Sequence, residues 1–190
     1  MRMLRLLVVM TALGVATTLP GGELLAQIGG RVSGGLEFPL GTTNDAFNLG
    51  WNARAGVLFS IPRFPSIVFD ANGAYTRLGA TTPVGGTKGP GLRILDAQLN
   101  ASYRVLTGVT GQARPYITAG LGFFNSKAVG DVVPAGAGSN TDLGFNVGAG
   151  FEFRLERLAM FAEGRFTDIM ASGPNIKYIP INVGLVLGGR

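Results

Sequence analysis

The chain has 190 residues, of which 46% are hydrophobic and only 14% are charged. This length suits a single domain, and the composition is too apolar for an intrinsically disordered protein. The formal net charge of +5 is mild, so charge alone indicates neither nucleic acid nor any other partner. The 31 glycines show no collagen period, and they favour an all-β architecture with close backbone approaches over a helix bundle.

Residues 1–26 have the features of a secretory signal peptide. Arg2 and Arg5 form a positive start, and a short apolar run follows from Leu6 to Ala16. We predict cleavage after Ala26, which leaves one domain over residues 27–190. The chain has no Cys, which excludes a lipid attached at the cut and a disulfide framework. No later apolar run approaches the roughly 18–20 residues of a transmembrane helix.

Alternation of apolar and polar residues predicts eight β-strands after the signal peptide. It is clearest over residues 143–155, where apolar side chains such as Phe145 and Phe151 alternate with glycines and with charged residues such as Glu152. A period of two places all the apolar side chains on one face of a strand, whereas a helix would mix the faces. In chain order, the predicted strands cover residues 30–38, 47–60, 67–76, 92–105, 115–124, 143–155, 158–167 and 178–187.

The predicted connections alternate between long and short. The long ones are 39–46, 77–91, 125–141 and 168–177, and the short ones are 61–66, 106–114 and 156–157. Strands of about ten residues can cross a bilayer when tilted, and long loops on one side with short periplasmic turns on the other are typical of outer-membrane barrels. We therefore predict an all-β fold: an eight-stranded, antiparallel, up-and-down transmembrane β-barrel.

Alternation alone leaves open whether the apolar face meets lipid or lines the cavity of a soluble, lipocalin-like carrier of apolar ligands. The polar face is rich in glycine and its cations are arginines, while Lys88, Lys127 and Lys177 all fall in predicted connections. Aromatic residues gather near the predicted strand ends, as in the two interfacial girdles of membrane barrels. These features favour lipid contact.

The polar face carries five basic and five acidic side chains, which would neutralise one another inside the barrel. The planar guanidinium group suits buried pairing with carboxylates, and side chains just fill the interior of an eight-stranded barrel. We therefore predict an ion-paired, largely plugged lumen. Its predicted residues are Arg31, Glu37, Arg54, Asp70, Asp96, Arg104, Glu152, Arg154, Glu163 and Arg165.

Four cations in the predicted long loops, Arg77, Lys88, Lys127 and Lys177, are candidates for surface contacts. They would face the anionic sugar-phosphate layer outside the cell, so a contact with lipopolysaccharide is one hypothesis. The alternative is that these charges only solvate exposed loops.

The sequence contains no His and no Cys, which excludes a Ser-His-Asp or Cys-His catalytic site and the usual zinc sites. Glu152 and Glu163 are the nearest pair of candidates for acid-base chemistry, but each has an arginine two residues further along its own face, which favours ion pairing. We predict no catalytic, metal-binding or cofactor-binding residue. The expected role is structural or surface interaction, and the alternative is a narrow, porin-like channel for small or apolar solutes.

Three stretches, at residues 114–122, 144–153 and 161–166, resemble the late strands of the outer-membrane β-barrel domain family, the small barrels of the OmpA/OmpX type. The resemblance extends over the whole mature chain, and its motifs specify no activity. It implies a location in the bacterial outer membrane, contact with membrane lipid and insertion by the barrel assembly machinery. Such barrels commonly end in an aromatic residue, whereas this sequence ends Leu187-Gly188-Gly189-Arg190.

Overall fold

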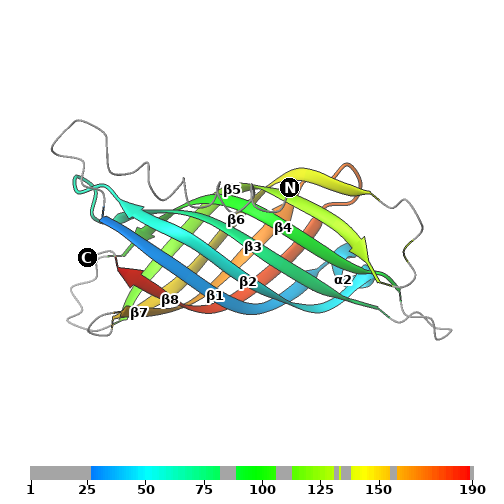
Figure 1. Ribbon diagram of the computed structural model, residues 1–190, viewed down its shortest axis with the longest axis horizontal. Coiled ribbons are helices and arrows are strands. Elements are labelled where there is room, and N and C mark those ends of the chain that lie inside the picture. Colours follow the sequence, from blue (N-terminus) through cyan, green and yellow to red (C-terminus); the bar gives the residue numbers. More distant parts are fainter. Residues whose placement is uncertain are drawn as a thin grey trace, which may run out of the picture.

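The computed structural model describes residues 27–81, 89–105, 113–130, 133, 138–154 and 158–188, and the predicted signal peptide lies outside these residues. Eight antiparallel strands form a closed barrel, in which each strand pairs with its sequence neighbours and β1 pairs with β8 (Figure 1). The predicted fold class is confirmed. The elements are β1 (Gln27–Leu40), α2 (Thr42–Ala46), β2 (Phe47–Ser60), β3 (Ile67–Ala80), β4 (Gly91–Arg104), β5 (Ala113–Val129), β6 (Ser139–Arg154), β7 (Leu158–Ile169) and β8 (Ile176–Gly188).

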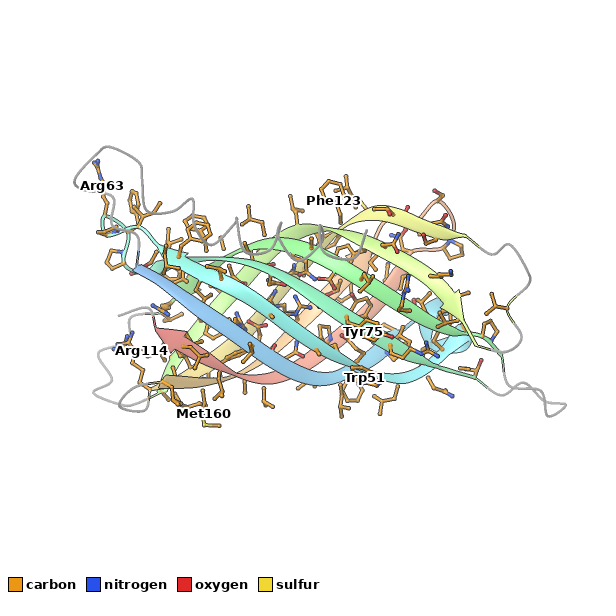
Figure 2. The ribbon with its side chains drawn as sticks, viewed as in Figure 1. Trp51, Arg63, Tyr75, Arg114, Phe123 and Met160 are labelled. Atoms are coloured by element: carbon orange, nitrogen blue, oxygen red, sulfur yellow. The ribbon has the colours of Figure 1, made fainter. Side chains whose placement is uncertain are left out.

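The apolar face of the strands points outward. Phe145, Val147 and Phe151 on β6 are 37%, 51% and 54% exposed, whereas Glu163 on the adjacent β7 is only 3% exposed. Figure 2 shows side chains such as Phe123 and Met160 projecting away from the barrel wall. A soluble carrier would place these residues around its cavity, so the structure contradicts that alternative. Within the described ranges, no helix has the length and hydropathy needed to span a membrane.

The barrel has two different ends. The start of β1, the end of β8 and the connection 61–66 lie at one end, which we call the turn end. The helix α2 and the connection 170–175 lie at the other, the loop end (Figure 1, right).

Several strands extend further toward the loop end than the sequence pattern predicts. β3 continues to Ala80, β5 to Val129, and β8 begins at Ile176, so the connections at the loop end are shorter than expected. The reason is that the alternation inverts there: inward side chains become apolar, such as Leu78 and Phe124, and outward ones become polar. A strand leaving the hydrocarbon layer needs polar residues outside, yet its backbone pairing continues unchanged.

Two apolar layers close the interior of the barrel. The loop-end seal consists of Leu78, Leu92, Ile94, Phe124, Ile169 and Tyr178, all buried. The turn-end seal consists of Leu58, Val68, Ala159, Phe161 and Val186. Most of the buried charged and amide side chains, such as Asp70, Asn100 and Arg165, lie on lumen-facing positions of the strands between these seals. The core of this protein is thus a polar layer between two apolar ones.

Candidate functional site

The centre of the lumen holds four buried charged residues, which we call the central quartet: Arg31 on β1, Asp70 on β3, and Glu163 and Arg165 on β7. Arg31 Nη2 lies 2.9 Å from Glu163 Oε2, and Arg31 Nη1 lies 3.4 Å from Asp70 Oδ2. Arg165 Nε lies 2.5 Å from Glu163 Oε1, and its Nη2 lies 3.6 Å from Asp70 Oδ2. Each cation thus contacts both acids, which forms a neutral group across the barrel.

Two aromatic side chains support this quartet. Tyr116 on β5 donates its hydroxyl hydrogen to Glu163 Oε2 at 2.9 Å. The guanidinium carbon of Arg31 lies 3.8 Å from the ring centroid of Phe161, which is the geometry of a cation–π contact. Burial of a charge is costly unless it is paired and hydrogen-bonded, so these contacts are what allow the quartet to lie in the barrel interior.

A second group lies toward the turn end. Arg104 Nη2 on β4 lies 3.0 Å from Glu152 Oε2 on β6, and Arg154 Nε lies 3.6 Å from Glu152 Oε1. The side chain of Arg154 is 45% exposed, so this predicted lumen residue lies at the mouth of the barrel. Glu152 and Glu163, the two candidate acid-base residues, are therefore each held by two arginines.

The other three predicted lumen residues are buried but make no direct ion pair with any described residue. Arg54 donates to Asn72 Oδ1 at 2.8 Å, Thr76 donates to Glu37 Oε1 at 3.1 Å, and Gln98 donates to Asp96 Oδ1 at 2.8 Å. These three residues of the predicted ion-paired lumen therefore lie near other charges without direct pairing among the described residues. Neutral polar side chains take the place of the expected partners.

Sequence reasoning missed these amides and the two seals. Asn146 on β6 donates to both Gln98 and Asn100 on β4, at 3.0 and 2.8 Å, and so links two strands across the interior. The signal was present, because Gln98 and Asn100 occupy the same alternate positions of β4 as Asp96, and so do the seal residues Leu92 and Ile94. An apolar residue on the polar face was the indication of a seal.

The lumen is also closely packed around its glycines. A Cβ atom built on Gly184 would lie 2.6 Å from the Phe161 ring, and one on Gly148 would lie 2.8 Å from Cγ of Arg165. A partly open pocket at the turn-end seal, lined by Arg31, Tyr116, Glu152 and Phe161 among others, has a volume of about 20 Å³, which is room for about one water molecule. The large side chains therefore fill space that the glycines vacate.

The four predicted surface cations have different surroundings. Arg77, Lys127 and Lys177 lie on β3, β5 and β8 and not in loops, as the longer strands require. Lys177 Nζ lies 3.5 Å from Asp168 Oδ2, whereas Lys88 lies outside the described residues. Arg77 and Lys127 flank Arg93, a residue that the sequence analysis did not single out. No metal-binding group of three or more acidic, His or Cys side chains occurs in the described part of the chain.

Comparisons with known proteins rest on structure alone. No protein-family model and no curated protein sequence matches the chain. Neisserial surface protein A superimposes with a TM-score of 0.66 at 14% identity, over 84% of this chain and 96% of that one. The N-terminal barrel of *Pseudomonas aeruginosa* OprF (16% identity, 85% and 99% covered) and Ail of *Yersinia pestis* (10%, 85% and 99%) give lower TM-scores of 0.48 and 0.49.

The likeness to Neisserial surface protein A concerns the fold, because the identity is low. It agrees with the closed order of eight strands and with the exposed apolar wall. The resemblance noted in the sequence is thereby confirmed for the fold. The chain is a transmembrane β-barrel with the fold of the small, eight-stranded, OmpA/OmpX-type barrels of the bacterial outer membrane.

Proposed function

We propose that this protein is exported by its signal peptide to the outer membrane and acts there as a closed, non-enzymatic barrel with a structural or surface-interaction role. The observation that carries the proposal is the layered lumen, in which the central quartet and its amide neighbours lie between two apolar seals. Membrane lipid surrounds the wall, and the barrel assembly machinery inserts it. In this proposal, the surfaces that bind other molecules are the outer wall and the loop end.

The layered lumen opposes conduction in two ways. A hydrated ion would have to lose its water at the loop-end seal, where Phe124, Leu78 and Ile94 are completely buried. It would then have to break contacts of the central quartet, and removing one partner from a buried ion pair costs about 3–5 kcal/mol. A steady pore is therefore not expected.

The two candidate acid-base residues, Glu152 and Glu163, are not free for the proton transfer that hydrolysis requires. The carboxylates of Glu152 and Glu163 both accept from arginine, and Glu163 accepts in addition from Tyr116. The lone pairs of these two carboxylates are therefore occupied by hydrogen bonds from arginine side chains. The proposal therefore includes the absence of catalysis.

The test combines location with permeability. Outer-membrane fractionation, with a comparison of unheated and boiled samples on a gel, checks location and barrel folding. Planar-bilayer recordings and liposome swelling with solutes of graded size then check the lumen. We expect heat-dependent migration, no large steady conductance and no solute-dependent swelling. Swelling with only the smallest solutes would favour the narrow channel instead, and a large steady conductance would refute the closed barrel.

A further inference from the structure

Three cations form a row on the outer wall near the loop end. Arg77 on β3 lies opposite Arg93 on β4, which in turn lies opposite Lys127 on β5. Adjacent strands are about 4.8 Å apart, so three like charges occupy neighbouring positions on one face. Like charges directly opposite each other destabilise a sheet. We call Arg77, Arg93 and Lys127 the basic row.

Nothing in the described part of the chain neutralises this row. No carboxylate there lies within 4.0 Å of the three cations, in contrast to Lys177, which pairs with Asp168. All three side chains are half-buried, and Arg93 Nε is buried without a hydrogen-bond partner. A half-buried, unpaired guanidinium group is costly, so an anion supplied from outside the protein would stabilise the row.

The aromatic neighbours place the row at the level of lipid headgroups. Trp51 on β2 lies opposite Arg77, and its ring centroid is 5.5 Å from that of Tyr75 (Figure 2). Both rings are on the outer wall, where Trp and Tyr side chains characteristically occupy the interface between hydrocarbon and headgroups. An anion on the basic row would thus belong to a lipid of the leaflet at the loop end.

An apolar trough begins below the row, on the same strands. It is a depression of about 600 Å³ lined by small residues, among them Ala55, Gly73 and Ala97, and by larger ones that include Leu99, Leu121 and Phe123. Gly73, Ala97 and Phe123 each lie four residues from a member of the basic row, or about 13 Å along their strands. A neighbouring depression of about 240 Å³, lined by Ala101, Ala119 and other outward residues, continues toward the turn end.

We propose that the β3–β5 wall binds the phosphorylated, acylated glycolipid anchor of lipopolysaccharide, lipid A, with a phosphate on the basic row and an acyl chain in the trough. Three cations in line suit a headgroup with more than one negative charge better than a singly charged phospholipid. The small residues of the trough leave room for an acyl chain, and the larger ones offer it apolar contact. This inference rests on the proposed outer-membrane location and adds a specific lipid partner to it.

Binding can be measured by native mass spectrometry and by titration of the folded, full barrel in zwitterionic detergent. The probes are bisphosphorylated lipid A, dephosphorylated lipid A, phosphatidylglycerol and inorganic phosphate. The triple variant Arg77→Ser/Arg93→Ser/Lys127→Ser removes the basic row, and Ala97→Phe fills the trough. Lys177→Ser is the matched control for loss of a cation elsewhere on the wall. Heat-dependent migration on a gel verifies that each variant is folded.

We expect the unchanged protein to prefer bisphosphorylated lipid A, and the triple variant to bind it on the order of a hundredfold more weakly. Lys177→Ser should bind as the unchanged protein does. Ala97→Phe should weaken binding of lipid A without changing the weak binding of inorganic phosphate, because it fills only the trough.

Equal binding by the triple variant, or equal binding of dephosphorylated lipid A, would overturn the phosphate contact. Phosphatidylglycerol binding as tightly as lipid A would overturn the choice of lipid, and unchanged lipid A binding by Ala97→Phe would overturn the acyl-chain position. A stable dimer that covers the trough would replace the lipid by a second copy of the chain. A variant that loses lipid A but still fractionates with the outer membrane and does not conduct leaves the proposed function intact.

Discussion

The ring of Tyr116 lies over Gly150, its direct partner on the neighbouring strand, so closely that a Cβ atom on the glycine would lie 2.6 Å from the tyrosine hydroxyl oxygen. The same Cβ would also lie 2.6 Å from the backbone oxygen of Ala162. Because Tyr116 donates to Glu163, the glycine indirectly fixes the geometry of the central quartet. The absence of one side chain thus positions another.

We expect Gly150→Ala to lower the free energy of unfolding by about 1–3 kcal/mol, because the added methyl group must displace a ring and a backbone oxygen. Urea unfolding in detergent, followed by the fluorescence of Trp51, measures this. Gly164→Ala is the matched control, since a Cβ atom at Gly164 meets nothing within 4 Å. Equal effects of the two substitutions would contradict the proposed packing.

We expect Glu163→Gln to destabilise the barrel by about 3–5 kcal/mol, because it leaves two buried arginines, Arg31 and Arg165, with Asp70 as their remaining shared acid. The same unfolding measurement applies. Arg154→Gln, which removes a half-exposed cation from the mouth of the barrel, should cost less than about 1 kcal/mol. An equal decrease in the free energy of unfolding for both variants would show that burial does not determine how much the quartet stabilises the barrel.

The adjacent residues Phe123 and Phe124 provide a test of the seals. Phe124 is completely buried in the loop-end seal, whereas Phe123 is 60% exposed on the wall. We expect Phe124→Ala to cost about 3–5 kcal/mol through the cavity that it leaves, and Phe123→Ala to cost less. Neither variant should conduct in planar bilayers, because the central quartet and the turn-end seal remain. A steady pore in Phe124→Ala would mean that this single layer closes the lumen.

The orientation of the wall toward hydrocarbon can be tested with introduced charge. Val147 lies on the outer face of β6, and we expect Val147→Arg to cost about 2–4 kcal/mol in a bilayer if it lies near the membrane midplane. Thr141→Arg, on the same face near the loop end, should cost about 0–1 kcal/mol. Unfolding from liposomes measures both. Equal costs would contradict a bilayer that covers Val147 but not Thr141.

The alternation of residue types was sufficient to predict the barrel, and the bounds of β2, at residues 47–60, agree with the structure. It failed where the polarity of the faces inverts. The prediction ended the third strand at residue 76, whereas β3 continues through Arg77 and Leu78 to Ala80. The prediction required apolar residues on the outer face, so it ended each strand where the outer face becomes polar. Backbone pairing continues beyond that point.

The pairing inside the lumen could be predicted only in outline. Equal numbers of acids and arginines indicated neutralisation, but which residues meet depends on the tilt and closure of the barrel. Arg31 reaches Glu163, 132 residues away, whereas Arg54 reaches only an amide. Such cross-barrel distances have no counterpart in sequence spacing. The basic row was partly visible, since Arg77 and Lys127 were singled out, but only the strand register brings Arg93 between them.

The position of Arg31 on the first strand has a consequence for how the barrel is completed. Its carboxylate partner Glu163 belongs to β7. Strand β1 lies near β7 because both strands pair with β8. Without that pairing, Arg165 and Glu163 can pair with each other, but Asp70 and Glu163 cannot share Arg31. The β1–β8 seam therefore brings the positive charge of Arg31 to Glu163, so a sheet in which this seam is open lacks an ion pair that the closed barrel has.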